Sequence, residues 1–156
     1  MKILIALDDS QHSDRALEFV TRIRWPAGSR VIVLTTQQPV APALTAADEA
    51  GAVLPGLFEE QRERLEALVA RAEGTLREAG FSTEGRVLAG DPREVLVQVA
   101  LSERADLLVV GSRGRTGIAK LMLGSVSSHV VTHAPCSVLV VKQPGRVTGE
   151  AKEQVS

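Results

Sequence analysis

Short apolar runs alternate with longer amphipathic segments along most of the chain. The apolar runs predict buried strands at residues 2–7, 30–36, 84–88, 107–110 and 138–141. Between them, apolar residues recur at helical spacing, which predicts helices after residue 10, over about 57–79, after residue 91 and over about 125–133. Strands that alternate with helices are typical of a parallel sheet with right-handed crossovers. The pattern therefore predicts an α/β fold.

Polar residues and glycine mark the ends of the predicted helices. Ser10 and Ser13 are two candidate N-caps for the first helix. In the sequence Asp91-Pro92-Arg93-Glu94, a capping acid, an early proline and a further acid predict the start of the third helix. Gly80 stands where the C-cap of the second helix is expected.

Two segments lack this periodicity. Residues 37–56 are rich in proline and alanine, and a connection of this length in a compact domain is usually functional or mobile. Residues 144–156 are polar and show no pattern, which predicts a flexible C-terminal tail. We therefore expect one domain at residues 1–143, followed by this tail.

The composition narrows the class of protein. A chain of 156 residues suits a single domain with its own core. The net charge is −1, from 18 basic and 19 acidic residues, and no basic tract is interleaved with aromatic residues, which argues against nucleic-acid binding. No apolar run is long enough to span a bilayer, and Asp8 interrupts the N-terminus before a signal-peptide core forms. A single cysteine, Cys136, excludes an intrachain disulfide and a cysteine zinc site. We expect a cytoplasmic protein without a membrane partner.

The segment from Gly111 to Ser125 contains the most informative chemistry. It follows a predicted strand and ends at the start of a predicted helix, and Arg113, Arg115 and Lys120 add positive charge. Glycines let backbone N–H groups approach an anion, and a helix N-terminus adds unpaired donors and the positive end of its dipole. The segment therefore predicts a phosphate-binding loop and a bound nucleotide. The motifs G-x4-G-K-S/T and G-x-G-x-x-G are absent, which argues against a P-loop NTPase and a Rossmann dehydrogenase.

The spacing Gly111-x2-Gly114-x9-Gly124-Ser125 resembles the G-x2-G-x9-G-S/T signature of the ATP-binding branch of the universal stress protein family. Residues 3–10, 105–106 and 133–141 are also similar to that family, so the resemblance extends over residues 2–142. It implies a single-domain, open five-stranded parallel sheet of order 3-2-1-4-5 with helices on both faces, a Rossmann-like fold. Strands 1 and 4 are then neighbours, and Asp8 and Gly111 meet in the crevice where the strand order reverses.

The resemblance also implies a cofactor, ATP with or without Mg²⁺, and a role for each matching residue. Asp8 would hold the nucleoside end, beside backbone groups of Ala6 and Leu7. Thr36 stands where the family usually presents a valine backbone to the adenine, and Thr35 replaces a frequent histidine. The other implied contacts are with the base or ribose at Val110 and with the phosphates at Gly111, Arg113, Gly114, Gly124, Ser125 and Val126, with Ser127 as a further hydroxyl.

Several polar residues have a second, structural interpretation. Asp8 or Asp9 could cap the first helix; we favour Asp8 on the ligand and Asp9 as a capping or solvated residue. His129 and His133 are four residues apart on a predicted helix, a spacing that suits a metal, but without an evident third ligand we expect them to pack on the helix. His12 could approach a phosphate or only water, and both interpretations stay open.

The sequence contains no residue set that resembles an efficient catalytic centre. It offers no Ser-His-Asp arrangement, no metal site and no base aimed at a γ-phosphate, whereas phosphoryl transfer needs such groups. We therefore expect no enzyme beyond slow ATP hydrolysis, and interpret the protein as an ATP-binding regulatory module of the stress response. The alternative is a nucleotide-independent dimeric interaction module, as in the other branch of the family.

A phosphorylation-switch receiver domain is a weaker alternative. Residues 8–9, Ser112 and Lys142 superficially fit such a domain. A receiver also needs an acid at the end of its third strand, and the candidate, Asp91, is better explained as a helix cap.

We expect a homodimer, together with a protein partner that the sequence does not name. In the implied order the strand at 138–141 lies at the edge of the sheet and would expose an apolar backbone ladder. Antiparallel pairing of two such edges across a two-fold axis would cover it.

Overall fold

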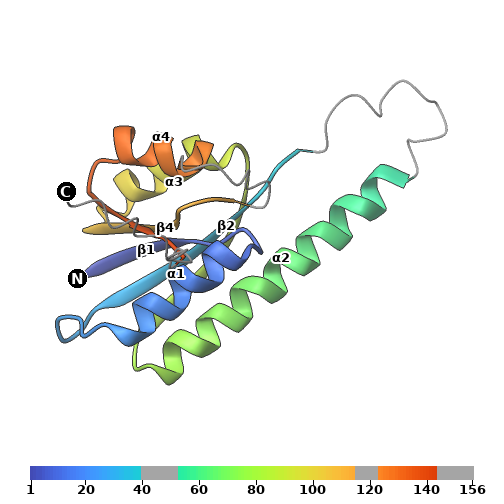
Figure 1. Ribbon diagram of the computed structural model, residues 1–156. Coiled ribbons are helices and arrows are strands. Elements are labelled where there is room, and N and C mark those ends of the chain that lie inside the picture. The colour runs from blue at the N-terminus through green and yellow to red at the C-terminus, as the bar shows by residue number, and fades with distance from the viewer. Residues whose placement is uncertain (40–52, 115–122, 144–156) are drawn as a thin grey trace, which may run out of the picture.

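One parallel sheet organises the molecule, and its strands follow the order β3-β2-β1-β4-β5 (Figure 1). The structure is a computed structural model that describes residues 1–39, 53–114 and 123–143. The strands are β1 (Lys2–Ala6), β2 (Arg30–Gln37), β3 (Ser82–Ala89), β4 (Leu107–Gly111) and β5 (Ser137–Val141). The central strand β1 pairs with β2 on one side and β4 on the other, so that Ile5 lies opposite both Val33 and Val109. The predicted fold class and strand order are confirmed.

Four helices cover the two faces of this sheet in the described part of the chain. They are α1 (Gln11–Arg22), α2 (Val53–Glu78), α3 (Pro92–Ser102) and α4 (Ser125–His133). Successive strand residues point to opposite faces, so Ile3 and Ile5 pack with α1 and α2, whereas Leu4 packs in a second cluster with α3 and α4. Both faces are therefore buried, which explains why the central strands are continuous apolar runs rather than alternating ones.

The ends of several elements differ from the predicted ones. Strand β3 is longer than the predicted 84–88, because Ser82 and Ala89 also pair with β2, opposite Arg30 and Gln37. Helix α2 begins at Val53, inside the segment predicted to be a connection, and its N-terminal turns project beyond the strands (Figure 1). Proline at position 55 is compatible with this start because the first turn of a helix has no intrahelical acceptor for its N–H groups. Helix α4 has the predicted bounds.

Two helices have N-caps formed by side chains that the sequence predicted as caps. Ser10 caps α1, and its hydroxyl forms a reciprocal capping box with Ser13. Asp91 caps α3 by accepting the N–H of Arg93. Asp9 does not cap α1 and is exposed, so of its two predicted roles the structure leaves that of a solvated residue.

Three predicted features lie wholly or partly outside the described residues. They are the tail at 144–156, most of the connection at 37–56 and the central part of the glycine segment, which includes Arg115 and Lys120. The division into a domain and a tail stays a prediction. In the described ranges, no helix is long and apolar enough to cross a membrane.

Candidate functional site

The carboxyl ends of β1 and β4 form the point at which the strand order reverses. From β1 the chain continues outward to β2 on one side, and β4 leads to β5 on the other. Ala6 ends β1 and Gly111 ends β4, so the loops that follow these strands start next to each other. Ligands in open α/β sheets bind at such a point.

The loop after β1 holds the Asp8 carboxylate in a defined orientation. Oδ1 of Asp8 accepts hydrogen bonds from the Ser10 hydroxyl at 2.5 Å and from the Ser10 N–H at 3.2 Å. Oδ2 lies against the backbone of Gly114, because a Cβ placed on that glycine would be 2.9 Å from it. The structure thus brings together the acid and the central glycine that the sequence singles out.

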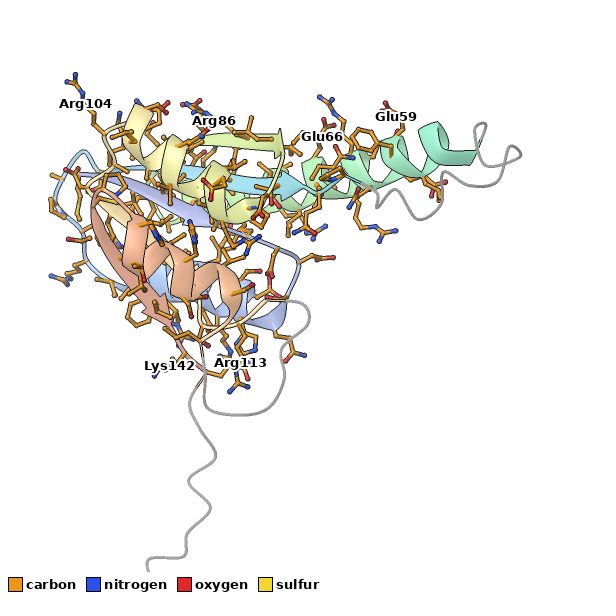
Figure 2. The ribbon with its side chains drawn as sticks, turned by 90° about the horizontal axis from the view of Figure 1, so that it is seen from above. Glu59, Glu66, Arg86, Arg104, Arg113 and Lys142 are labelled. Carbon is orange, nitrogen blue, oxygen red and sulfur yellow. The ribbon has the colours of Figure 1, made fainter. Side chains whose placement is uncertain are left out.

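The two ends of the glycine segment are joined to each other and to the sheet. The N–H of Gly124 donates to the carbonyl of Ser112 at 2.9 Å, and the N–H of Ser112 donates to the carbonyl of Val141 at 2.9 Å. The second bond places Arg113 and Lys142 on the same side of the molecule, over the ends of β4 and β5 (Figure 2). Positive charge therefore flanks the described part of this segment.

The start of α4 has no side-chain cap. Its N-cap is Gly124, which offers no side-chain cap to the first-turn N–H groups near Ser125 and Val126. Ser127 is 3% exposed and its hydroxyl donates to the carbonyl of Gly111 at 2.7 Å. The Ser127 hydroxyl therefore fastens α4 to the end of β4, and the prediction that it is a further phosphate ligand was wrong.

Gly111 has a packing role of its own. A Cβ at this position would lie 2.7 Å from the backbone carbonyl carbon of His12, so no other residue allows α1 to approach β4 this closely. The His12 ring lies near the same strand end, with Nδ1 at 3.5 Å from the Ser112 hydroxyl. His12 therefore lies beside the glycine segment, and both predicted roles, a contact with phosphate or with water, stay predictions.

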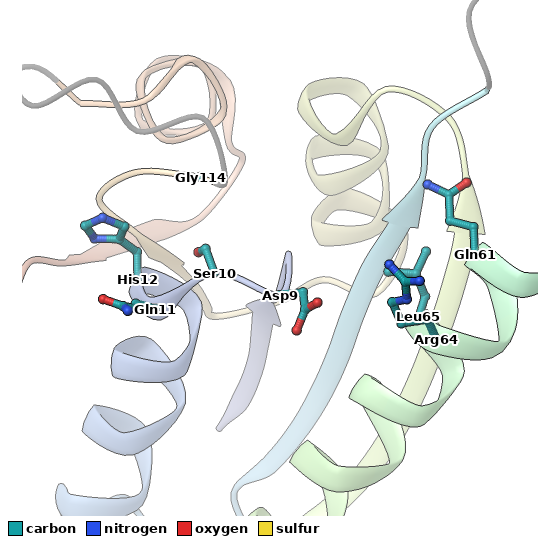
Figure 3. Close-up of a pocket in the computed structure, with 8 residues that line it drawn as sticks. All are labelled: Asp9, Ser10, Gln11, His12, Gln61, Arg64, Leu65 and Gly114. Atoms are coloured by element: carbon teal, nitrogen blue, oxygen red, sulfur yellow. The ribbon is translucent and has the colours of Figure 1, made fainter.

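A hollow of about 550 Å³ opens between α1, α2 and the glycine segment (Figure 3). Asp9, Ser10, Gln11 and His12 line one side, Gln61, Arg64 and Leu65 of α2 line the other, and Gly114 completes it. Gly114 is the one residue here that the sequence predicted for the site. The α2 residues were missed because an amphipathic helix pattern does not say which polar side chains face a crevice.

The residues predicted for the base and ribose line the strand ends. Leu7 and Val110 are 4% and 3% exposed, so their side chains belong to the core, and the Leu7 N–H already donates to the carbonyl of Leu34 at 2.9 Å. Ala6 and Thr36 are half-buried at the ends of β1 and β2. Any contact of Leu7 or Val110 with a nucleotide would therefore have to come from backbone groups that are not already hydrogen-bonded.

The histidine pair on α4 packs as a local structural feature. The rings of His129 and His133 stack with centroids 4.2 Å apart, and His133 Nδ1 lies 2.9 Å from the carbonyl oxygen of His129. His129 Nε2 is 3.6 Å from a carboxylate oxygen of Glu94 on α3. Within the described ranges, no three histidine, cysteine or acidic side chains form a group that could hold a metal ion.

The sheet order, which reverses between β1 and β4, defines a doubly wound α/β protein. Residues 1–142 match the model of the universal stress protein family, and the chain belongs to that family. A universal stress protein of Thermus aquaticus is 36% identical over 141 residues, which span 90% of this chain and 97% of that protein.

Solved structures agree with this assignment. Protein MJ0577 of Methanocaldococcus jannaschii superposes with a TM-score of 0.79 at 26% identity, over 92% of this chain and 96% of that one. A universal stress protein in complex with cAMP superposes with a TM-score of 0.64 at 26% identity, over 91% and 96% of the two chains.

Proposed function

We propose that this chain belongs to the ATP-binding branch of the family and binds an adenine nucleotide in the crevice at the ends of β1 and β4. The observation that supports this most is the contact between the Asp8 carboxylate and the Gly114 backbone. In a nucleotide the ribose and the phosphates are adjacent, and the acid and the glycine that the family resemblance assigns to them are adjacent here too. The complex of a 26% identical relative with cAMP supports the same class of ligand.

Each part of the nucleotide has a candidate partner. Ribose hydroxyls would donate to Asp8, and the phosphates would accept from the Gly114 backbone and from the first turn of α4 at Ser125 and Val126. Arg113 would add positive charge, while any Mg²⁺ would arrive on the phosphates. The base would lie toward Thr36, at the end of β2.

The hollow extends this crevice toward α2. Arg64 brings a guanidinium to one wall and Asp9 a carboxylate to the other. A nucleotide whose phosphates extend into the hollow would approach Arg64, which favours polyphosphates over a nucleoside.

We expect the bound state, rather than turnover, to be the functional output. Rapid phosphoryl transfer needs a positioned nucleophile and strong neutralisation of charge in the transition state. A regulatory module needs only that binding changes a surface which a partner recognises. Phosphate release at no more than a few turnovers per hour would fit this role, and a fast burst would contradict it.

Direct identification of the ligand tests the proposal. The purified protein is denatured, the released small molecules are identified by mass spectrometry, and ATP, ADP, AMP and adenosine are titrated calorimetrically into nucleotide-free protein. Absence of both co-purified nucleotide and measurable binding would leave the nucleotide-independent interaction module.

Two adjacent acids supply a matched pair of variants. Asp8→Asn and Asp9→Asn each remove one negative charge from the same loop, so general electrostatics favours tighter binding of anionic ATP in both. We expect Asp8→Asn to bind ATP about tenfold more weakly instead, because a hydrogen bond to a charged group is lost. Equal affinities in the two variants would remove Asp8 from the site.

We further propose that the chain forms a homodimer through β5. This strand lies at the edge of the sheet, and Val138, Leu139 and Val140 are only half-buried. Sedimentation velocity should show a dimer that Val140→Pro converts to monomers. Val138→Lys, which keeps all backbone donors, is the second variant, and a dimer that survives both would exclude this interface.

A further inference from the structure

The hollow between α1 and α2 begins at the phosphate end of the proposed nucleotide site. Gly114, which is proposed to bind the phosphates, also lines the hollow. Thr36, toward which the base is proposed to lie, is not among the lining residues. A volume of about 550 Å³ is within the range of pockets that enclose small-molecule ligands. The hollow therefore has room for a group that is attached to the phosphates.

Opposite charges lie on the two walls of this hollow. Asp9, in the loop after β1, and Arg64, on α2, face each other across it (Figure 3). In the part of the chain that the structure describes, no hydrogen bond or ion pair engages either of these two side chains, and both residues are exposed. The hollow thus offers a guanidinium on one wall and a carboxylate on the other to a ligand.

The backbone at Asp9 gives this carboxylate an unusual setting. Its φ is 59°, in the left-handed region that residues other than glycine seldom occupy, although aspartate tolerates it better than most. The cap of α1 does not account for the acid, because Ser10 forms that cap. Residues with such a backbone cluster at ligand sites, where their strain helps to orient a side chain.

The phosphates of ATP would match only one of the two walls. They would accept hydrogen bonds from the Arg64 guanidinium, whereas a γ-phosphate close to Asp9 would meet a like charge. An ionised carboxylate only accepts hydrogen bonds, and a neutral ligand supplies donors in its hydroxyls. The amides of Gln11 and Gln61, on the two walls, both donate and accept, which also suits hydroxyls. The hollow therefore fits a diphosphate that is followed by a neutral group with hydroxyls.

We infer that the site prefers, over ADP and ATP, an adenosine diphosphate whose β-phosphate carries a neutral, hydroxyl-bearing group such as a sugar. Arg64 contacts the diphosphate, and Asp9 accepts hydrogen bonds from the hydroxyls of the terminal group. This inference rests on the proposed function, because it extends the same nucleotide site into the hollow. Asp9 is then the residue that determines specificity for the far end of the ligand.

The test is calorimetric titration of AMP, ADP, ATP, ADP-ribose and ADP-glucose into nucleotide-free wild type, Asp9→Asn and Asp14→Asn. The measured quantity is the ratio of the dissociation constant of ADP to that of each ADP-sugar. We expect the wild type to bind at least one ADP-sugar about fivefold more tightly than ADP, and Asp9→Asn to lose this preference, as the loss of a hydrogen bond to a charged group predicts. ATP should bind Asp9→Asn at least as tightly as the wild type, because a like charge has been removed.

Asp14→Asn is the matched control. Asp14 is an exposed acid in the first turn of α1 and does not line the hollow. Its replacement removes an equal charge from the same region, so the affinities for ADP and the ADP-sugars should shift together and their ratio should stay that of the wild type. Asparagine tolerates a positive φ as aspartate does, so Asp9→Asn should unfold in urea with the wild-type midpoint.

The outcomes separate the inference from the proposed function. If ADP or ATP binds the wild type as tightly as both ADP-sugars do, or if the preference survives in Asp9→Asn, the inference is overturned and the nucleotide site stands. If Asp9→Asn weakens AMP by the same factor as the ADP-sugars, Asp9 serves the nucleotide itself, and the inference is overturned as well. A wild-type protein that binds none of the five ligands overturns the inference and the proposed function together.

Discussion

Replacement of Gly114 by alanine isolates the contact on which the proposed site depends. The new Cβ would lie 2.9 Å from Oδ2 of Asp8, closer than real Cβ contacts, so the carboxylate has to shift by a few tenths of an ångström. The backbone of Gly114 is not in the left-handed region, and alanine is therefore accepted there without backbone strain. The shift pulls on Oδ1, which Ser10 holds at 2.5 Å.

The expected loss falls on binding rather than on stability. A hydrogen bond from a ligand hydroxyl to a charged carboxylate is worth about 1.5–3 kcal/mol, which corresponds to roughly 10- to 100-fold in the dissociation constant of ATP. In the free protein the carboxylate can move together with the side chain of Ser10, so the free energy of unfolding should fall by less than about 1 kcal/mol.

Calorimetric titration and urea unfolding measure the two quantities separately, and Gly74→Ala is the control. Gly74 lies inside α2 with no atom within 4 Å of an added Cβ, so alanine should stabilise the protein by about 0.5–1 kcal/mol and leave ATP binding unchanged. Wild-type affinity in Gly114→Ala would refute the placement of ribose at Asp8. A large loss of stability in Gly114→Ala would show that the contact is structural.

Three further substitutions test other parts of the structure. Gly111→Ala brings a Cβ to 2.7 Å from the backbone of α1, so urea unfolding should show a loss of about 1–3 kcal/mol, because a helix backbone cannot yield as a side chain does. The hydrogen-bonded ion pair with Arg93 lowers the pKa of Asp91 to about 2 from its ordinary 3.8. The ionised Asp91 therefore stabilises the folded protein above pH 4, and this stabilisation is lost as the pH falls toward 2. Asp91→Asn keeps an oxygen that can cap the helix but removes the charge. The difference in unfolding free energy between this variant and the wild type should therefore shrink as the pH falls from 4 to 2. A difference that does not change with pH would show that the ion pair is not its cause. Arg64→Ala should weaken ATP binding about threefold, which is the typical effect of removing one exposed charge. Arg71→Ala removes an equal charge from the same helix outside the hollow and should leave ATP binding unchanged.

The alternation of elements was predictable because the sheet is buried on both faces. Runs such as Leu107–Gly111 are continuously apolar, and helices between them show one apolar stripe. The order of the strands came from the family resemblance, since hydrophobic periodicity says nothing about which strands are neighbours. Element ends were less predictable where tertiary contacts decide them.

Strand β3 illustrates this limit. Glu84 and Arg86 interrupt its apolar pattern, yet both lie within the strand, where Glu84 pairs with Arg30 on β2 and Arg86 pairs with Glu103 beyond α3. These partners are distant in the sequence, so the local pattern of apolar and polar residues does not predict the ion pairs. The residues that the prediction left out are Ser82, Thr83 and Ala89, which extend the strand at its two ends because they pair with β2.

For the site, the sequence predicted the residues whose spacing forms a motif and missed those that act through packing. Gly114 was singled out by the spacing of the glycine motif and Asp8 by the family resemblance, and the structure brings these two residues close together. Ser10 was recognised only as a candidate cap, because its bond to Asp8 spans two residues and depends on the positive φ of 59° at Asp9, which turns the loop. Arg64 was not found at all.

The three glycines of the signature turn out to serve different neighbours, and this decides how substitutions in it should be interpreted. Gly111 makes room for the backbone of His12, Gly114 for the carboxylate of Asp8, and Gly124 for the backbone of Arg113. If Gly111→Ala loses nucleotide binding, the displacement of α1 is a sufficient explanation, and a phosphate contact at Gly111 does not follow. Gly114→Ala disturbs a side chain that is proposed to contact the ligand, and it is therefore the substitution of the three whose effect on binding reports on the site itself.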